Sequence, residues 1–252
     1  MTSTKLFVAS VYAPSPWNRE WYRLQSKFIL QNTPNVSVRF GVLLNGIDVE
    51  DVGAAVDVIG VCSGNTGHSA GMAKLLEVFR ASDCTHFLFL DSDCFPVHPN
   101  WFNVIVAQMK RFNKRFAAPI RYENLDRFPH PCAFFCDVDA IKDERINFEI
   151  GFSGENVLNE TVRDVGNAML PLLPEILPLM RSNLVNHHPV AAGVYHHLFY
   201  HHGAGSRNFK FRLINKYEYC EHWWSGDQDD TLAVQLRKEL FADPDEFLRV
   251  LM

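Results

Sequence analysis

Short apolar runs alternate with amphipathic stretches through the first half of the chain, and this alternation constrains the fold more than any other feature. The runs at 5–12, 38–44, 57–61 and 86–90 have the length and apolar content of buried strands. Helical spacing of apolar residues follows Trp17, the glycine-rich turn 64–71 and Pro99. The alternation predicts an α/β fold whose central sheet is largely parallel and flanked by helices, with ligands beyond the carboxyl ends of the strands.

The second half of the chain is less regular. Residues 116–120 and 132–136 are predicted strands, and 155–168 is a predicted helix. Prolines at 171, 174 and 178 are expected to break the following stretch into loops. The apolar stretch 194–200 surrounds two histidines. A final helix over 231–241 is predicted from the spacing of Leu232, Leu236 and Leu240.

Size and composition favour a single domain over residues 1–252. Apolar residues make up 47% of the chain, and no repeat, low-complexity tract or linker interrupts it. A chain of this size can bury a substantial core. The formal charge of −5 comes from 24 basic and 29 acidic residues without a long run of one sign. We therefore expect no nucleic-acid partner, because phosphate backbones are bound by clustered Lys and Arg.

The cysteines and the amino terminus bear on location. Six cysteines in a chain of 252 residues do not form a dense disulfide framework, so we expect reduced thiols and a cytoplasmic setting. The amino-terminal residues show no secretory signal, and no apolar stretch has the length of a transmembrane segment. A peripheral position at a membrane, on a lipid-linked acceptor, is left open.

The tripeptide Asp91-Ser92-Asp93 directly follows the apolar run 86–90. Side chains alternate along a strand, so Asp91 and Asp93 are expected to point the same way and Ser92 the other way. Two close carboxylates repel unless a proton or a cation neutralises one of them. Mn²⁺ or Mg²⁺ prefers oxygen ligands and can bridge a diphosphate. The tripeptide therefore predicts a divalent-metal and diphosphate site.

Two plainer interpretations compete with the metal site. The pattern Asp-x-Asp recurs by chance, and such carboxylates often cap a following helix. A second copy, Asp137-Val138-Asp139, also follows an apolar run. Because 140–142 continues like a helix, one of these two aspartates is predicted to be an N-cap rather than a metal ligand.

Three sequence motifs, which follow one another along the chain, resemble those of a known family. Residues 65–73 form an Asn-x-Gly turn with small residues opening a helix, 89–93 end a Phe-Leu-Asp-x-Asp strand, and 99–101 form a Pro-x-Trp helix start. In these motifs the chain resembles the GT-A-fold glycosyltransferases, especially the family 2 group. The well-matched part covers about a fifth of the chain, and a looser match runs from about 6 to 207. The resemblance implies a GT-A (Rossmann-like) fold with a nucleotide-binding half at about 1–112 and an acceptor-binding half at about 113–252.

That family binds a nucleoside-diphosphate sugar, with Mn²⁺ or Mg²⁺, at the ends of the first strands. Members often carry an acidic residue directly after the second strand, where this chain has Asn45-Gly46-Ile47-Asp48. The resemblance assigns donor binding to a set at the strand ends and the glycine-rich turn: Ala9, Val11, Tyr12, Asn45, Asp48, Asn65, Gly67, Gly71, Asp91 and Ser92.

The resemblance also implies a general base. The family commonly places it in a Glu-Asp pair that opens a helix in the acceptor half. The comparable pair here is Glu155-Asn156, and an amide cannot usefully accept a proton. Glu155 is therefore the predicted base and Asp164 the second candidate. In the plainer interpretation, Glu155 only stabilises the start of a helix.

A late histidine contacts the metal or the diphosphate in many GT-A enzymes. The segment 200–207 matches this description, so His201 and His202 are predicted metal ligands and Arg207 a predicted diphosphate contact. If 194–202 were helical, His197 and His201 would share a face at a spacing typical of zinc sites. The sequence supplies no evident third ligand for zinc.

Together these features predict an enzyme, a metal-dependent glycosyltransferase that moves a sugar from a nucleoside-diphosphate sugar to a hydroxyl of a glycan, lipid-linked glycan or protein. Inversion at the sugar carbon follows from the resemblance alone. A nucleotidyltransferase is one alternative, although the stretch 13–19 after the first strand lacks the glycine such enzymes usually need. A non-catalytic nucleotide-sugar-binding module is another, because Asn156 stands where a base is expected.

Overall fold

The computed structural model describes residues 4–53, 56–124, 126–149, 154–155, 161–162, 164–183, 191–203 and 231–252. Its strands and helices follow in this order: β1 (Lys5–Tyr12), α1 (Asn18–Asn32), β2 (Ser37–Asn45), α2 (Val49–Val52), β3 (Val58–Cys62), α3 (His68–Arg80), β4 (His86–Asp91), β5 (Cys94–Pro96), α4 (Trp101–Arg111), β6 (Phe116–Pro119), η1 (Tyr122–Asn124), β7 (Ala133–Asp137), η2 (Ala140–Lys142), β8 (Gly154–Glu155), β9 (Thr161–Val162), η3 (Asn167–Glu175), β10 (Ile176–Leu179), β11 (Gly193–Tyr195), β12 (Phe199–His201), α5 (Thr231–Ala242) and α6 (Pro244–Leu251), where η marks a 3₁₀ helix.

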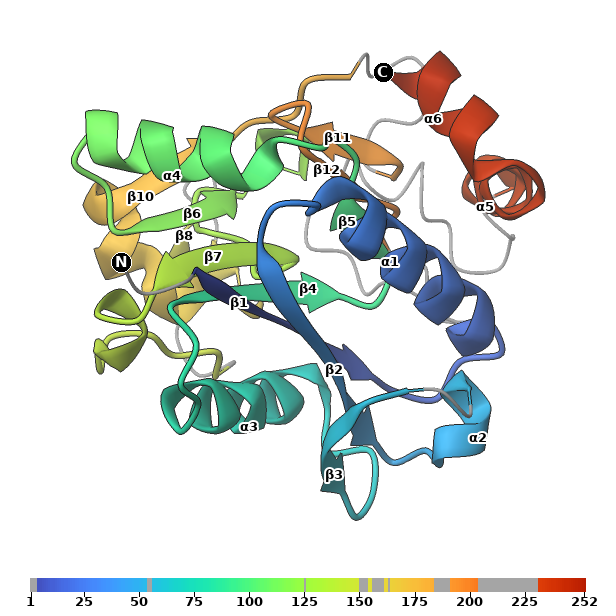
Figure 1. Cartoon of the computed structure of the whole chain (residues 1–252), viewed down its shortest axis with the longest axis horizontal. Helices are drawn as coiled ribbons and strands as arrows, with labels where there is room; N and C mark the ends of the chain where they lie inside the picture. Colours follow the sequence, from blue (N-terminus) through green and yellow to red (C-terminus); the bar gives the residue numbers. More distant parts are fainter. Residues whose placement is uncertain are drawn as a thin grey trace.

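A seven-stranded sheet with the order β10-β6-β7-β4-β1-β2-β3 forms the centre of the fold (Figure 1). Strand β1 runs parallel to both of its neighbours, β2 and β4. Strand β7 is antiparallel to β4 and β6, so it alone runs against the others. The predicted fold class, a largely parallel sheet flanked by helices, is confirmed.

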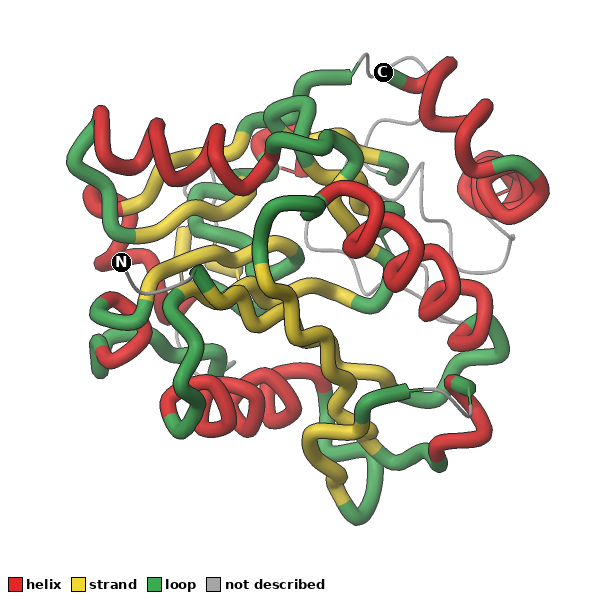
Figure 2. Tube along the Cα trace, viewed as in Figure 1, coloured by secondary structure: helices red, strands yellow, loops and turns green. Residues whose placement is uncertain are grey.

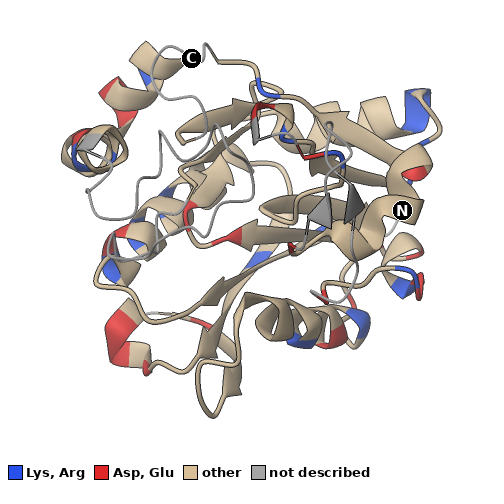
Figure 3. Ribbon diagram, turned by 180° about the vertical axis from the view of Figure 1, so that it is seen from behind, with Lys and Arg blue, Asp and Glu red and all other residues tan. Residues whose placement is uncertain are grey.

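Helices cover both faces of this sheet, with α3 on one face and α1 and α4 on the other (Figures 1 and 2). Successive side chains of β1 point to opposite faces of the sheet, and the strand is buried on both faces. Phe7 packs in one cluster with Phe79 of α3, whereas Leu6 packs in another with Trp101 of α4. A strand covered on both faces is apolar at nearly every position. In Figure 3 the charged residues accordingly lie mainly on helices and loops.

A smaller antiparallel sheet with the order β11-β12-β5 branches from the central one. The chain leaves the large sheet at Asp91, the end of β4, and enters the small one at Cys94, three residues later. Helices α5 and α6 pack beside it, with Leu236, Leu240 and Phe247 in one buried cluster. The prediction that Leu232 belongs to the apolar face of α5 was wrong, because its side chain is 40% exposed. None of the described helices has both the length and the apolarity to cross a bilayer.

Where the structure describes it, the predicted helix over 155–168 is not an α-helix. Glu155 lies in β8 and Thr161–Val162 form β9, and these two strands pair antiparallel. Gly166 has a left-handed backbone (φ 104°), and a Cβ there would collide with the carbonyl oxygen of Pro129. A left-handed glycine ends any α-helix, so the chain continues as the 3₁₀ helix η3. The helical spacing of a few apolar residues also suits a strand followed by a turn, which is why the prediction failed.

Prolines were also wrongly expected to leave only loops after residue 170. Pro171 and Pro174 lie inside η3, and Pro178 lies in β10. Strand β10 is at the edge of the sheet and pairs with β6 alone. An edge strand tolerates proline because one side of its backbone needs no donor for a neighbouring strand.

The stretch 194–202 is a hairpin, not a helix. His196 and His197 both have positive φ, 55° and 58°, and the N–H of Leu198 donates to the carbonyl oxygen of Tyr195 at 2.9 Å. Two successive positive φ values are typical of a type I′ turn, which joins antiparallel strands. The helical zinc spacing considered for His197 and His201 therefore does not apply.

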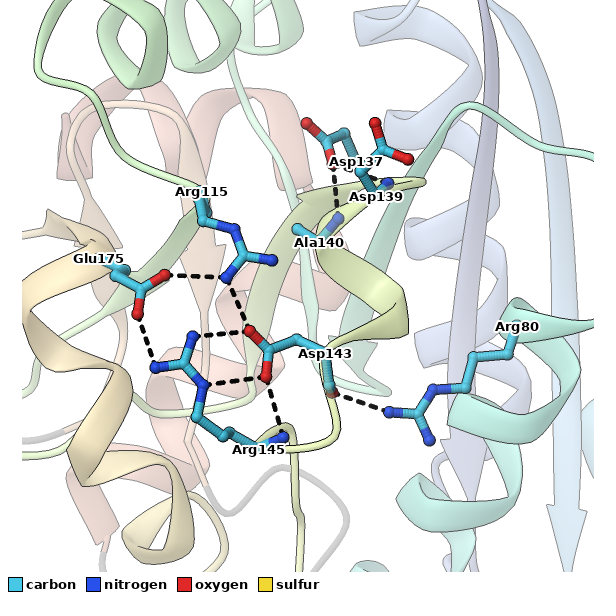
Figure 4. Close-up of polar contacts among 8 residues, drawn as sticks. All are labelled: Arg80, Arg115, Asp137, Asp139, Ala140, Asp143, Arg145 and Glu175. Atoms are coloured by element: carbon cyan, nitrogen blue, oxygen red, sulfur yellow. Dashed lines mark hydrogen bonds and ion pairs between the residues drawn. The ribbon is translucent and has the colours of Figure 1, made fainter.

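The second Asp-x-Asp lies at the opposite end of the sheet from the first, because Asp137 pairs in register with His86 at the start of β4. The carboxylate of Asp137 accepts the N–H groups of Asp139 and Ala140 at 3.0 and 2.8 Å. These bonds cap the turn that begins η2, as Figure 4 shows. The N-cap position of η2 is Asp139, whose side chain makes no cap hydrogen bond, and the carboxylate of Asp137 satisfies the N–H groups instead.

Beside this cap, a polar cluster joins three parts of the second half of the chain (Figure 4). Asp143 accepts hydrogen bonds from the guanidinium groups of Arg115 and Arg145, at 2.7 Å each. Glu175 pairs with the same two arginines at 2.9 and 2.7 Å. The hydrogen bonds from Arg145 hold the pKa of the Asp143 carboxyl well below its usual range.

We expect the substitution Asp143→Ala to lower the free energy of unfolding by about 1–2 kcal/mol at pH 7, since it removes charge-assisted bonds to partly exposed arginines. The exposed Asp139→Ala should change stability by less than about 0.5 kcal/mol. Asp143 has a lowered folded-state pKa, so its contribution is present above the ordinary carboxyl pKa and is lost as pH falls below it. The difference between wild type and Asp143→Ala, measured by urea unfolding, should therefore shrink below about pH 4. An equal difference at pH 3 and pH 7 would contradict this account.

Candidate functional site

The turn between β4 and β5 holds the two aspartates of the first Asp-x-Asp. Asp91 is the last residue of β4, whereas Asp93 lies in the turn itself. The expected strand alternation across all three residues was therefore wrong, and Ser92 lines the same cavity as its neighbours. The turn nevertheless brings both carboxylates together, with their side chains only 15% and 6% exposed.

Gln25 of α1 holds this turn by hydrogen bonds to its backbone. Its amide nitrogen donates to the carbonyl oxygens of Asp91 and Cys94, at 2.9 and 2.7 Å. Its amide oxygen accepts the hydroxyl of Tyr12 at 3.1 Å. A fully buried amide that bonds both ends of a four-residue turn restricts where the carboxylates between them can lie.

The third side chain of the site, His201, belongs to strand β12. His201 pairs in register with Cys94 of β5. Its Nε2 lies 3.5 Å from Asp91 Oδ2 and 3.5 Å from Asp93 Oδ1. The three ligand atoms all lie within 4.8 Å of one another. Two carboxylate oxygens and one imidazole nitrogen suit a divalent ion such as Mn²⁺, so the chemistry of this donor set fits a metal.

His202, the other predicted histidine ligand, is not part of this group. Its Nδ1 lies 2.7 Å from the Tyr200 hydroxyl, and its ring packs against Trp21 with centroids 5.3 Å apart. Its backbone N–H donates to the carbonyl oxygen of Asp93 at 3.1 Å. The structure thus brings His201 to the aspartates through its side chain, and His202 through its backbone.

A further histidine, which the sequence interpretation did not single out, balances the charge of the aspartates. His68, the first residue of α3, places Nε2 3.1 Å from Asp91 Oδ1. Burial alone would raise the pKa of the Asp91 carboxyl, but the charges of His68 and His201 outweigh it and lower that pKa well below its usual range. Burial lowers the pKa of His68, yet Asp91 raises it overall. Two imidazoles therefore neutralise the carboxylates.

The opposite wall of the site comes from the second half of the chain. Arg121 donates through Nε and Nη2 to the fully buried Asp126, at 3.1 and 2.8 Å, and lies 3.9 Å from Asp164. A cavity of about 200 Å³ lies between the two walls. The side chains that line it come from both halves: Val11, Ala13, His68, Asp91, Ser92, Asp93, Arg121, His130, Asp164, Val165 and His201.

Of the predicted donor-binding residues on β1, Val11 lines the cavity. Ala9 and Tyr12 are fully buried, and Tyr12 contributes through its bond to Gln25. Gly71 of α3 lies against β1, where a Cβ would come 2.7 Å from a methyl group of Val11. The glycine therefore permits close packing of helix and strand beside the site.

Asn45 acts on the glycine-rich turn from the end of β2. Its side chain is fully buried, accepts from the N–H and hydroxyl of Thr66, and donates to the carbonyl oxygen of Gly67. Asn65 in turn accepts the N–H of Gly67, which directly precedes α3 and His68. Asp48 is exposed and forms a capping box at the start of α2. Asn45 thus holds the loop that positions His68.

For two of the predicted site residues, Glu155 and Arg207, the structure does not describe the side chain. Glu155 lies in β8, but its side chain is outside the described part of the structure. Arg207 lies outside the described residues altogether. Asp164, the second candidate base, does line the cavity.

No protein-family model and no curated protein sequence matches the chain. Among solved structures, an active-site mutant of LgtC is similar over 69% of this chain and 72% of its own, with 13% identity and a TM-score of 0.46. Galactosyltransferase LgtC in complex with donor and acceptor sugar analogues is similar over 69% and 73%, with 14% identity and a TM-score of 0.43. The bifunctional glycosyltransferase WbbM, in its apo form, is similar over 71% of this chain and 39% of its own, with 13% identity and a TM-score of 0.44.

We expect Gln25→Ala to destabilise the protein by about 2–4 kcal/mol, because it leaves buried carbonyl oxygens without a donor. It should also weaken Mn²⁺ binding, measured by isothermal titration on the folded variant, because the Asp91–Cys94 turn is released. Gln235→Ala, which removes an exposed glutamine of α5, is the matched control and should change neither quantity. Reduced stability with wild-type Mn²⁺ affinity would show that Gln25 does not set the position of the carboxylates.

Proposed function

We propose that this chain is a metal-dependent glycosyltransferase that uses a nucleoside-diphosphate sugar. The observation that carries the proposal is the cluster of Asp91, Asp93 and His201, whose ligand atoms lie within 4.8 Å of one another. The cluster stands at the carboxyl end of central strand β4, where open α/β sheets bind ligands. It also borders a cavity with polar side chains on the facing wall.

In this proposal the three side chains hold Mn²⁺ or Mg²⁺, and the ion supplies positive charge for a departing diphosphate. The low exposure of Asp93 and His201 supports this role, because charge interactions are stronger where water is excluded. Val11, Ser92 and the turn held by Asn45 are the proposed surroundings of the donor. Asp48, Asn65 and Arg207 stay predicted donor contacts on the family resemblance alone.

Asp164 is the proposed general base. Its Oδ1 accepts the N–H of Val165 at 2.9 Å, and its Oδ2 lies 3.9 Å from Arg121. These contacts fix a carboxylate across the cavity from the metal ligands. It would accept the proton of the acceptor hydroxyl while the hydroxyl oxygen bonds to the anomeric carbon and the bond from that carbon to the diphosphate breaks. Glu155 stays a second proposed base, and inversion is part of the proposal.

We also propose that residues 1–252 act as one domain with two functional halves. Asp91 and Asp93 belong to the half at about 1–112, whereas Arg121, Asp164 and His201 belong to the half at about 113–252. A cavity lined by both halves supports this division into donor and acceptor sides. The acceptor is proposed to be a hydroxyl of a glycan, lipid-linked glycan or protein, and the location cytoplasmic.

Binding of UDP, GDP, CMP or dTDP should raise the melting temperature only for a diphosphate nucleotide and only with Mn²⁺, because a ligand of the native state stabilises it by mass action. Asp93→Asn should abolish this shift. Asp139→Asn, in the second Asp-x-Asp, is the matched control and should retain it. A shift that survives in Asp93→Asn, or none with any nucleotide, would remove the proposed function.

Replacing the proposed base should separate chemistry from binding. We expect Asp164→Asn to lower kcat for hydrolysis of the matching nucleotide sugar by about 10²–10⁴-fold, while leaving the Mn²⁺-dependent melting shift intact. The amide retains an oxygen for the Val165 N–H, so the fold should persist. The exposed Asp139→Asn is the control, since Asp139 lies at the opposite end of the sheet. Wild-type kcat in Asp164→Asn would transfer the role to another group, with Glu155 the next candidate.

A further inference from the structure

The loop before β7 places a histidine beside the metal ligands. Because β7 is antiparallel to β4, the start of β7 lies next to the end of β4, and Ala133 pairs with Leu90. One residue earlier, the carbonyl oxygen of Cys132 accepts the N–H of Asp91 at 3.1 Å. His130 therefore reaches the cavity, with its ring centroid 5.8 Å from that of His201.

The hydrogen bonds of His130 define which ring nitrogen carries a proton. The backbone N–H of Cys132 donates to Nδ1 at 3.2 Å, so Nδ1 is the acceptor and the ring proton is on Nε2. The residue is only 7% exposed and lines the cavity. The ring also hydrogen-bonds with the side chain of Cys132. A nearly buried N–H donor thus faces the space that the substrate would occupy.

The surroundings favour an anionic partner for this donor. The nearby carboxylates are already engaged, Asp91 by His68 and His201, and Asp93 by His201. A diphosphate bound to a divalent ion held by Asp91, Asp93 and His201 would bring further anionic oxygens into the cavity that His130 lines. We propose that His130 is a catalytic residue that donates a hydrogen bond from Nε2 to an oxygen of the leaving diphosphate, an inference that rests on the proposed function.

A hydrogen bond from His130 to the leaving diphosphate is consistent with the bonds that form and break in the sugar transfer. As the acceptor oxygen bonds to the anomeric carbon, the bond from that carbon to the diphosphate oxygen breaks, and its electron pair stays on the diphosphate. The acceptor proton goes to a carboxylate, proposed to be Asp164. His130 keeps its proton throughout and lowers the energy of the charge that develops on the diphosphate.

A positioning role is the competing explanation, since His130 also holds the backbone of Cys132, which bonds to Asp91. Two substitutions separate these roles because each imitates one ring nitrogen. The Oδ1 of asparagine in His130→Asn can replace Nδ1 and accept the Cys132 N–H, while the cavity-facing donor is lost. The Nε2 of glutamine in His130→Gln can replace the donor, while the bond to Cys132 is lost.

The experiment is isothermal titration of the full chain with Mn²⁺ alone and then with inorganic pyrophosphate in saturating Mn²⁺. For His130→Asn we expect wild-type Mn²⁺ affinity and pyrophosphate affinity reduced roughly 10- to 100-fold, the usual effect of losing a hydrogen bond to a charged group. For His130→Gln we expect pyrophosphate affinity within about threefold of wild type. Circular dichroism and melting temperature confirm that each variant is folded.

Two results would overturn the role of His130 while leaving the proposed function in place. One is wild-type pyrophosphate affinity in His130→Asn. The other is a parallel loss of Mn²⁺ and pyrophosphate affinity in His130→Gln with neither lost in His130→Asn, which would assign a positioning role through Cys132. If the wild-type protein binds no pyrophosphate in Mn²⁺, the proposed function itself fails, and the role of His130 fails with it.

Discussion

Two carboxylates buried side by side impose the main constraint on this molecule. Asp91 and Asp93 repel one another and lose hydration, so the surrounding structure must supply positive charge or donors. His201 and His68 come from a late hairpin and from the start of α3 to meet that demand. Gln25 and the buried Asn45 hold the two loops that carry these groups. Much of the polar structure within the core can therefore be understood as support for one pair of acidic side chains.

Strand direction decides which loops can reach this pair. Parallel strands β1 and β4 contribute residues at or after their carboxyl ends, as doubly covered sheets usually do. The reversed strand β7 instead brings the residues that precede it, including His130 and Cys132, to the same edge. The hairpin of β11 and β12 then attaches to β5 and adds His201. One antiparallel strand thus allows the second half of the chain to complete a site begun by the first.

The first half of the fold was predictable because its strands are largely apolar and its longer helices are amphipathic. The aspartates and His201 were likewise predicted as a group, although the reason given, strand alternation, does not hold in a turn. The second half was harder because its structure depends on tertiary contacts. Gly166 takes a left-handed backbone against Pro129, which no periodicity indicates. Arg121 follows the carboxyl end of β6, which runs in the same direction as β4, and His130 precedes β7. Neither residue belongs to a motif, and the reversal of β7 is what brings His130 to the site.

The pairing of β5 with β12 has a consequence for synthesis of the chain. Cys94 and His201 are neighbours in the small sheet but are separated by roughly 100 residues of sequence. At a typical ribosomal rate of about 5–20 residues per second, β12 emerges roughly 5–20 s after β5. During that interval Phe95, fully buried in the finished protein, lacks the strand that covers it. The edge of β5 therefore stays apolar and unpaired until β12 has been synthesised, and an apolar strand edge of this kind is prone to aggregation.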